Sequence, residues 1–458
     1  MNRLIHILAT ILTFCILATG CIEDSFSNSP SDQPEFSTDT VQLGKIFTDE
    51  PSTTSIFVVH NRYSKGMNIS TINVTGADAS AFRINVDGLS GTSFSNVEIR
   101  PNDSIFVMVE ATLPEVKGAE EGIFHADLNF ITNGVTRSVL LEATGQNVTR
   151  LRAHTIADNT VFTADRPYQV FDSLIVAENV TLTLEPGTQL LFHDGAYMRV
   201  YGTLLGQGSA EAPIVLSGDR RGNVVGDISF DIMSKQWDGL AFAPTSVSNS
   251  LKYTEIKNTK SGVIVENASL DLINCRLRNS GGTVLAAMDA NIKAVGCELA
   301  EAAEGLVDLY GGTYVFNHCT FANNYLFAVI TGSAIDFNLG EEETSELHLD
   351  VSNSIIAGLG TAISGGDITG QDIHFRHCLF QSDGADDENF IDCIYGEDPL
   401  FYTIRNEYLF DYRLQPDSPA IGAADAALTL DEALIDWYGN LRGDAPDLGA
   451  YVFRLIEE

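Results

Sequence analysis

The sequence predicts an all-β protein in which a β-sandwich precedes a parallel β-helix that a C-terminal segment closes. Cys275, Cys297 and Cys319 are spaced 22 residues apart, and each stands in a similar short phrase. A period of this length is too long for a coiled-coil heptad and too short for a repeat of helix pairs. It fits one coil of a β-solenoid, whose successive coils stack about 4.8 Å apart. Before the repeat, short strands of alternating polarity separated by turn residues indicate the sandwich.

The first 20 residues are typical of a targeting signal. Arg3 supplies a positive charge, and residues 4–18 form an almost unbroken apolar run that is short for a membrane-spanning helix. Residues 17–20 followed by Cys21 resemble the lipobox of bacterial lipoproteins. The resemblance implies cleavage before Cys21 and lipidation of its thiol. Ordinary secretion, with Cys21 as an unmodified thiol, is the alternative.

Residues 21–36 are predicted to form a flexible tether, because Ser, Asn, Asp and Pro dominate their composition. Glu23 and Asp24 resemble the acidic surface-export signal of Bacteroidetes lipoproteins. The resemblance implies a protein that is anchored by its lipid in the outer membrane and exposed at the cell surface. A chance acidic pair in a polar tether is the alternative.

The chain is strongly acidic, with 62 Asp and Glu against 26 Lys and Arg and a formal net charge of −36 at pH 7. Such a surface repels nucleic acid and anionic polysaccharides. It argues against both partners, unless calcium or a local basic patch intervenes. The same acidity also keeps a large β-protein soluble, so it identifies no partner by itself.

Residues 37–148 are predicted to form a sandwich of about seven short strands, for example residues 55–59 and 104–109. The Cys–Trp–Cys signature of antibody domains is not present. Several phrases in this part together resemble the Hydin-type Ig-like domain of bacterial surface proteins. The resemblance implies a spacer or docking module without catalytic residues. These phrases are residues 41–44, 76–84, 99–104, 128–133 and 140–145.

Residues 149–397 are predicted to form the β-helix. Short strands such as residues 174–176 and 197–204 are broken by Gly, Pro and Asn, as the tight corners of a solenoid require. This run resembles the first coils of right-handed parallel β-helix proteins of the pectate-lyase type. At one coil per repeat, we expect about ten or eleven coils.

Two sets of residues are predicted to stack along the coils. Asn258, Asn279 and Asn323 follow strands of different coils, and asparagine tolerates a left-handed corner and bonds along a ladder. The cysteines are predicted to be buried free thiols, because parallel side chains on adjacent coils have poor geometry for a disulfide. This structural ladder consists of Cys275, Cys297, Cys319 and Cys378.

Residues 398–458 carry a separate set of phrases, at residues 398–401, 411–421 and 446–451. They closely resemble the choice-of-anchor Q segment that closes many bacterial β-helix proteins. An open solenoid end exposes unpaired strand edges, so we expect this segment to be a cap over the end.

Within this cap, Arg442 is predicted to form a structural ion pair with Asp436 or Asp447.

The chain lacks the phrases expected of known β-helix enzymes. Galacturonase-type relatives carry Asn-Thr-Asp, Asp-Asp, Gly-His-Gly and Arg-Ile-Lys phrases, and this chain does not contain the four in full. Lyases need a Lys or Arg base near a calcium ion, and the solenoid is poor in lysine. The sequence therefore singles out no catalytic residue and no cofactor other than a possible calcium ion. Its ligands would be Asp383, Asp386, Asp387 and Glu388. The alternative is that this loop is a solvated acidic turn that binds no ion.

Three hypotheses for function follow. The first is a non-catalytic surface lipoprotein whose β-helix binds glycan or an envelope protein. The second is a polysaccharide lyase or glycoside hydrolase with an atypical site, and the third is a structural accessory of an outer-membrane complex. An enzyme predicts clustered carboxylates with a Lys or Arg on neighbouring coils facing one groove. A binding protein predicts exposed aromatic and polar side chains without that cluster.

Overall fold

The computed structural model describes residues 25–225, 228–338, 346–406 and 408–456. The predicted signal peptide and the predicted lipidation site Cys21 lie outside these residues. The chain divides into two compact units, Met1–Asn147 and Val148–Glu458, and each is described by itself. Among the described residues, no helix is long and apolar enough to cross a membrane.

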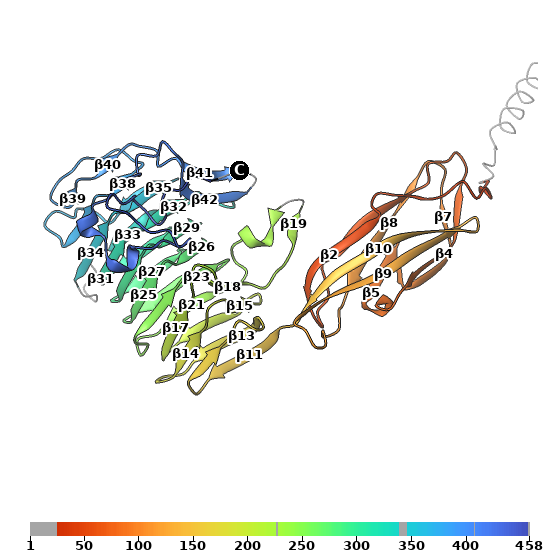
Figure 1. Ribbon diagram of the computed structural model, residues 1–458, viewed down its shortest axis with the longest axis horizontal. Helices are drawn as coiled ribbons and strands as arrows, with labels where there is room; N and C mark the ends of the chain where they lie inside the picture. Colours follow the sequence, from red (N-terminus) through yellow and green to blue (C-terminus); the bar gives the residue numbers. More distant parts are fainter. Residues whose placement is uncertain (1–24, 226–227, 339–345, 407, 457–458) are drawn as a thin grey trace, which may run out of the picture. The chain divides into compact units, whose positions relative to one another are not determined.

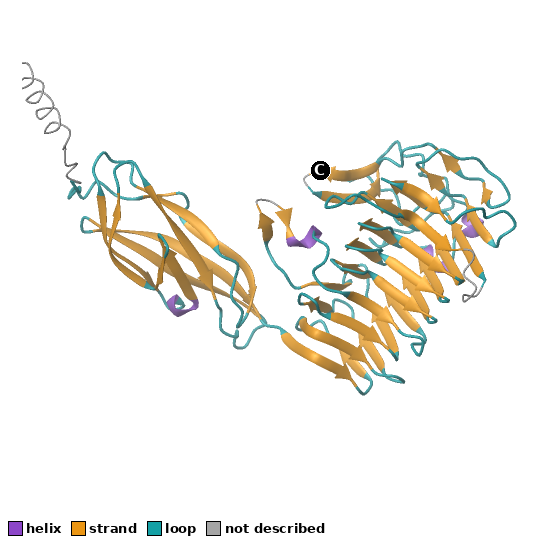
Figure 2. Ribbon diagram, turned by 180° about the vertical axis from the view of Figure 1, so that it is seen from behind, coloured by secondary structure: helices purple, strands orange, loops and turns teal. Residues whose placement is uncertain are grey.

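The first unit is a β-sandwich of two five-stranded sheets around one apolar core (Figure 2). In β8, Val107 and Val109 are buried, whereas Phe106 and Met108 are exposed, because successive side chains point to opposite faces of a strand. One sheet consists of β1 (Glu35–Phe36), β3 (Ser55–His60), β8 (Ser104–Ala111), β5 (Phe82–Val86) and β6 (Leu89–Gly91). The other consists of β2 (Thr40–Phe47), β10 (Val135–Gln146), β9 (Glu121–Thr132), β4 (Met67–Thr75) and β7 (Ser93–Ile99), and the short helix η1 spans Ala79–Ala81.

The tether prediction is wrong for residues 25–36, which pack onto the sandwich. The Ser27 amide donates a hydrogen bond to the Gly66 carbonyl at 2.9 Å. The ring of Phe26 lies against the same glycine, and Phe36 packs against the sandwich core. An argument from composition gives too little weight to these two phenylalanines, whose partial burial holds an otherwise polar stretch against the sandwich.

The second unit confirms the predicted parallel β-helix, whose coils stack along one axis (Figure 1). Its strands form parallel sheets of 18 and ten strands. The strand pairings divide the larger sheet into two faces, so the helix has three faces, which we name A, B and C. The ten described strands of face C agree with the predicted ten or eleven coils.

Strand β11 (Thr149–Ile156) pairs with β13 (Tyr168–Val176), from which faces A and B both start. Face A continues with β15 (Gln189–Phe192), β18 (Ile214–Gly218), β23 (Thr254–Lys257), β26 (Arg276–Ser280), β29 (Glu298–Ala302), β32 (Thr320–Asn323), β35 (Ile355–Gly358), β38 (Leu379–Phe380) and β40 (Ile394–Tyr395). Face B continues with β16 (Tyr197–Val200), β21 (Gly239–Phe242), β24 (Val263–Glu266), β27 (Leu285–Met288), β30 (Val307–Tyr310), β33 (Ser333–Asn338) and β36 (Thr361–Ser364).

Face C consists of β12 (Thr160–Phe162), β14 (Thr181–Leu184), β17 (Thr203–Gln207), β22 (Asn249–Lys252), β25 (Ser269–Ile273), β28 (Asn291–Val295), β31 (Gly312–Asn317), β34 (Leu347–Ser352), β37 (Ile373–Arg376) and β39 (Phe390–Ile391). Outside the three faces lie β19 (Asn223–Val225), β20 (Ile228–Ser229), η2 (Phe230–Ile232), the hairpin of β41 (Phe401–Asn406) and β42 (Leu409–Leu414), η3 (Ala426–Leu428) and η4 (Asp431–Ala433).

Corners with left-handed backbone bound face A on both sides. On the side of face C, φ is 49° at Asn274 and 50° at His318. On the side of face B, φ is 65° at Asn258 and 57° at Asn279, two of the predicted corner asparagines, whereas the third, Asn323, does not have a positive φ. Asparagine tolerates this conformation better than most residues, which explains its recurrence.

The cysteine ladder lies inside the β-helix, and its thiols are free and in register. The Cys275 amide lies 3.4 Å from Cys297 Sγ. The register also places two residues in the ladder that the sequence analysis left out, a serine and a fifth cysteine. In coil order the ladder is Cys275, Cys297, Cys319, Ser354, Cys378 and Cys393.

The C-terminal segment, residues 398–456, lies along the outside of face A rather than over the end of the helix, so the predicted placement of the cap is wrong. Face A has outward-facing apolar side chains that this segment covers, which supplies the physical reason. These side chains are Ala300, Ala322, Ile355, Ala357 and Leu379. The segment hydrogen-bonds corner residues of several coils, namely Asn274, Asn317, His318 and Asn353.

The ion pair predicted for Arg442 does not form in the described residues. Arg442 instead donates hydrogen bonds of 2.8–3.0 Å to four main-chain carbonyls of its own segment. Asp436 accepts from the Val452 amide at 2.9 Å, and Asp447 accepts from the Phe453 amide at 2.7 Å. The looped main chain here has few strand partners, and its buried polar groups need these charged side chains instead.

Candidate functional site

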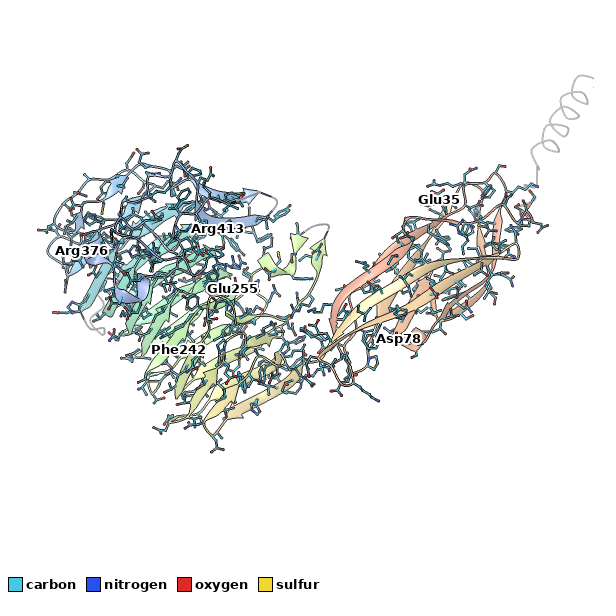
Figure 3. The ribbon with its side chains drawn as sticks, in the orientation of Figure 1. Glu35, Asp78, Phe242, Glu255, Arg376 and Arg413 are labelled. Atoms are coloured by element: carbon cyan, nitrogen blue, oxygen red, sulfur yellow. The ribbon has the colours of Figure 1, made fainter. Side chains whose placement is uncertain are left out.

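A cavity of about 380 Å³ lies between face A and the hairpin of β41 and β42. We name it the flank cavity. Figure 3 labels Arg413 on β42 and Glu255 on β23, which form ion pairs with the lining residues Asp411 and Arg278. The lining residues are Asp231, Ile232, Arg276, Arg278, Asn279, Glu298, Glu301, Tyr402, Thr403, Tyr408, Leu409, Phe410, Asp411, Tyr412 and Tyr438.

Strand register places a row of alternating charges on this side of face A. Glu255, Arg276 and Glu298 occupy equivalent positions in β23, β26 and β29. Leu277 and Leu299, the residues that follow the last two, belong to the helix core, because side chains alternate along a strand. Opposite charges on neighbouring strands attract each other, so the row favours the observed register.

The row continues into an ion-pair network. Lys257 Nζ lies 2.7 Å from Asp231 Oδ1 and 3.1 Å from Glu255 Oε2. Arg278 forms an ion pair with Glu255 and approaches Glu298 Oε1 at 3.8 Å. Burial raises the pKa of Glu255, but the charges of Arg278 and Lys257 outweigh it and lower this pKa to about 2. Glu255 is therefore a fixed anion at neutral pH.

Arg276 joins face A to the C-terminal segment. Its guanidinium carbon lies 4.4 Å from the ring centre of Trp437, 5.1 Å from that of Tyr438 and 5.2 Å from that of Tyr451. Its Nε donates a hydrogen bond to the Tyr451 hydroxyl at 2.8 Å. Cation–π contacts of this kind are strongest where water is excluded, so this side chain fixes one wall of the cavity.

Glu301 has an unusual backbone conformation for its residue type. The pairing of β26 with β29 places it at the corner position that Asn258 and Asn279 occupy in the preceding coils. Its φ is 60°, a value that glutamate rarely adopts and that costs energy. Asn323, in the next coil, bonds the main chain beside this bend through Ala302, at 2.9 and 3.1 Å.

Glu301 is also buried, with 1% of its surface exposed. Its Oε1 accepts a hydrogen bond from the Tyr412 hydroxyl, whereas its Oε2 has no hydrogen-bond partner among the described residues. Burial raises the pKa of Glu301 to about 8, although the Tyr412 hydrogen bond opposes the shift. At neutral pH this side chain is therefore mostly a carboxylic acid that holds a proton.

Glu298 is the second buried carboxylate of the cavity, with 3% of its surface exposed. Its Oε2 accepts a hydrogen bond from the Tyr451 hydroxyl. Its Oε1 and the Nε of Arg278 have no hydrogen-bond partner among the described residues. Both atoms are shielded from solvent by their neighbours, so the floor of the cavity is polar but these unpartnered atoms do not lie at its surface.

Tyrosines form the outer part of the cavity. The exposed fraction is 41% for Tyr402, 40% for Tyr408 and 44% for Tyr438. A tyrosine ring offers an apolar face and a polar hydroxyl. Rings of this kind above polar groups are a surface on which a flat, hydroxylated ligand can lie.

The four predicted calcium ligands do not assemble a site. Asp386 accepts from the Asp392 and Cys393 amides, Asp387 from the Asn389 and Phe390 amides, and Glu388 from the Gly370 amide. Asp383 lies near Gly396 instead. Carboxylates committed to separate amides cannot converge on one ion, and in the part of the chain that the structure describes no group of His, Cys, Asp or Glu could hold a metal.

Sequence analysis missed Glu298 and Glu301, although a signal for Glu301 was present. The corner pattern of Asn258, Asn279 and Asn323 has a glutamate where the intermediate coil should carry asparagine. Carboxylates with arginines on neighbouring coils facing one groove are also the arrangement that the sequence analysis expected of an enzyme.

No family model matches the chain, and no curated protein matches it. Among solved structures, a protein of unknown function from Porphyromonas gingivalis W83 is 15% identical, with a TM-score of 0.19. That match covers 27% of this chain and 49% of the other, so this chain matches about half of that protein's length.

Two glycoside hydrolases are also similar to parts of this chain. The catalytic unit of a GH87 α-1,3-glucanase from Streptomyces thermodiastaticus is 8% identical over 73% of this chain and 90% of its own, with a TM-score of 0.14. A family 123 glycoside hydrolase from Clostridium perfringens is 9% identical over 26% of this chain and 30% of its own, with a TM-score of 0.19. These scores are low, and the likenesses identify neither a family nor a function.

Proposed function

We propose that this protein binds carbohydrate in the flank cavity. The observation that carries the proposal is a set of exposed tyrosine rings, Tyr402, Tyr408 and Tyr438, over a cavity whose lining is rich in polar side chains. A sugar ring presents C–H groups to an aromatic face and hydroxyls at its edge. Each hydroxyl both donates and accepts, so the edge of a saccharide can bond polar side chains that line the cavity, such as Asp231 and Asp411.

The charge of the site indicates an uncharged saccharide. Glu301 holds its proton at neutral pH, and the remaining carboxylates are matched by an equal number of cations. The carboxylates are Asp231, Glu255, Glu298 and Asp411, and the cations are Lys257, Arg276, Arg278 and Arg413. A balanced site in a chain of net charge −36 does not attract a polyanion.

Replacing Tyr402 by alanine is expected to weaken glycan binding about fivefold, because one aromatic stacking contact contributes about 1 kcal/mol. Titration calorimetry with a panel of uncharged polysaccharides, namely β-glucan, α-glucan, xylan and mannan, measures the effect. Tyr197→Ala is the matched control, since Tyr197 is 40% exposed but lies on face B. Equal affinity of both variants and the wild type would place the ligand elsewhere, and no binding to any glycan would refute the proposal.

We also propose that the protein is a lipoprotein displayed at the cell surface, on the strength of the lipobox resemblance at Cys21 and the acidic pair Glu23 and Asp24. Cys21→Ala is expected to abolish incorporation of labelled fatty acid and to release the protein from the membrane fraction. Loss of the full-length protein when intact cells are treated with protease would support surface exposure. A Cys21→Ala variant that stays membrane-bound would contradict the lipid anchor.

A further inference from the structure

We propose that residues 383–388, which we name the acidic loop, close the end of the β-helix and keep its last coil from pairing with a second copy of the chain. The C-terminal segment, which was expected to cover this end, covers face A instead. The acidic loop lies between β38 and β39 and takes the place of a face B strand, since face B ends with β36 in the described part of the chain. This role is independent of ligand binding in the flank cavity.

Strands β39 and β40 end their sheets, so each has a strand neighbour on one side only in the part of the chain that the structure describes (Figure 1). The Phe375 amide of the preceding coil donates to the Asn389 carbonyl at 2.8 Å. The His377 amide likewise donates to the Ile391 carbonyl at 2.9 Å. The main-chain N–H and C=O of Phe390, which lies between these two carbonyls, therefore point away from the preceding coil. An open strand edge of this kind pairs readily with another chain.

Asp387 occupies the place beside Phe390 that a further coil would take. Its amide donates to the Phe390 carbonyl at 2.9 Å, and its Oδ1 accepts from the Phe390 amide at 3.0 Å. Asp386 holds the following corner, where its Oδ2 accepts from the Asp392 amide at 2.9 Å and its Oδ1 from the Cys393 amide at 3.1 Å. Hydrogen bonds to carboxylates are stronger than those between neutral groups. Two acidic side chains thus close the edge that a strand would otherwise use.

The acidic loop also covers the last ring of the coil stack. Gly384 lies against the ring of Tyr395, since a Cβ at this glycine would stand 2.4 and 2.5 Å from two ring carbons. The Tyr395 hydroxyl donates to Asp386 Oδ1 at 3.1 Å. The ring stacks on Phe380 of the preceding coil, with 5.6 Å between ring centres, so it cannot move aside. A larger residue at position 384 would therefore push the loop off the end.

The last coil presents apolar side chains that continue the core. Phe390 stacks on Phe375 with 5.0 Å between ring centres. Phe390, Cys393 and Tyr395 are only partly buried, whereas Phe375 and Phe380 in the coil beneath belong to the buried core. A further coil would bury the last rings in the same way. The gain from burying this apolar surface favours association wherever the loop does not prevent it.

The first coil of a second copy has the matching edge. Strands β11 and β12 begin the sheets that β40 and β39 end, and all pairings in these sheets are parallel, so stacking a first coil on a last coil would continue both. Arg150 and Arg152 are exposed on β11, whereas residues 381–398 contain seven Asp and Glu and no Lys or Arg. Opposite charges favour this contact. Head-to-tail contacts that do not close into a ring build filaments, which the acidic loop prevents.

The test uses residues 22–458, which include every residue that the structure describes, and follows sedimentation over a wide range of concentration. Asp386→Ala combined with Asp387→Ala removes the carboxylates that close the edge, and Gly384→Leu displaces the loop without a change of charge. Both are expected to form oligomers that grow with concentration, whereas the wild type stays monomeric. Glu266→Ala combined with Asp271→Ala is the control, because it removes the same charge from exposed positions of central coils, and it is expected to stay monomeric.

Hydrogen exchange separates loss of the closed end from loss of the fold. In both loop variants the amides of Phe390, Asp392 and Cys393 are expected to exchange at least about tenfold faster than in the wild type, because each loses a hydrogen bond to a carboxylate. The amides of the central strands β26 and β29 are expected to keep their wild-type rates.

Oligomers formed by both loop variants with intact central strands would support the proposal. Loop variants that stay monomeric although these amides exchange faster would overturn it, because an open edge would then not lead to association. Association of the wild type, or of the charge control to the same extent as the loop variants, would also overturn it. Unchanged exchange in both variants would show that the loop does not close the edge.

Discussion

Replacement of Arg442 by methionine is expected to lower the free energy of unfolding of the β-helix by about 3–5 kcal/mol. Arg442 is 4% exposed, and burial lowers its pKa to about 10, although the charges of Asp436 and Asp447 oppose the shift. It remains charged at neutral pH and bonds four main-chain carbonyls. Methionine fills a similar volume but leaves these four carbonyls without a donor and removes a positive charge near the two aspartates.

Urea unfolding followed by tryptophan fluorescence measures this effect in one unit alone, because both tryptophans, Trp237 and Trp437, lie in the β-helix unit. Arg454→Met is the control, since Arg454 is exposed and its replacement is expected to change the free energy by less than about 0.5 kcal/mol. Equal unfolding midpoints for the two variants would show that Arg442 does not hold the C-terminal segment.

Replacement of Glu301 by asparagine is expected to change how stability depends on pH. The wild-type folded state keeps the Glu301 proton up to about pH 8, whereas the unfolded chain loses it near 4.5. Between these values folding takes up a proton, so the wild type loses stability as the pH rises. The variant lacks this titration, and its free energy of unfolding should therefore gain on the wild type by about 1.4 kcal/mol per pH unit in this window.

The comparison needs unfolding curves at about pH 5 and about pH 9 for the two proteins. Near pH 5 the variant is expected to be no more stable than the wild type, because the shorter side chain withdraws from Tyr412. Glu304→Asn is the control at an exposed position of the same coil, and its stability should follow the wild type at both values. Parallel profiles for Glu301→Asn and the wild type would show that the carboxyl group is ionised at neutral pH.

Much of the β-helix could be predicted because similar residue types recur at equivalent buried positions of successive coils. The spacing of Cys275, Cys297 and Cys319 gives the length of one coil, and Asn258 and Asn279 mark where the backbone turns left-handed. The position of the C-terminal segment could not be predicted in the same way. Small outward-facing residues such as Ala300 and Ala322 tolerate water as well as burial, so the sequence does not reveal that they are covered.

The candidate site was harder to find because its parts come from distant segments. Glu255, Arg276 and Glu298 form one row only after the chain is wound into coils of the correct register. The tyrosines above them follow about a hundred residues later, and no local pattern connects Tyr412 with Glu301. The sequence analysis placed a possible calcium site in the acidic loop at residues 383–388 instead, because four carboxylates lie near one another there. In the structure, side chains of this loop accept hydrogen bonds from main-chain amides.

The separation of 111 residues in sequence between Glu301 and Tyr412 sets an order of events during folding. Coils of the β-helix can pair with their predecessors early, since every pairing is short in sequence. The hairpin that covers the cavity follows the coils in the sequence. Until it docks, Glu301 faces water, where its carboxyl group ionises, and burial beneath Tyr412 returns a proton to it. The cavity is thus a late product of folding, assembled only once the coils beneath it are in place.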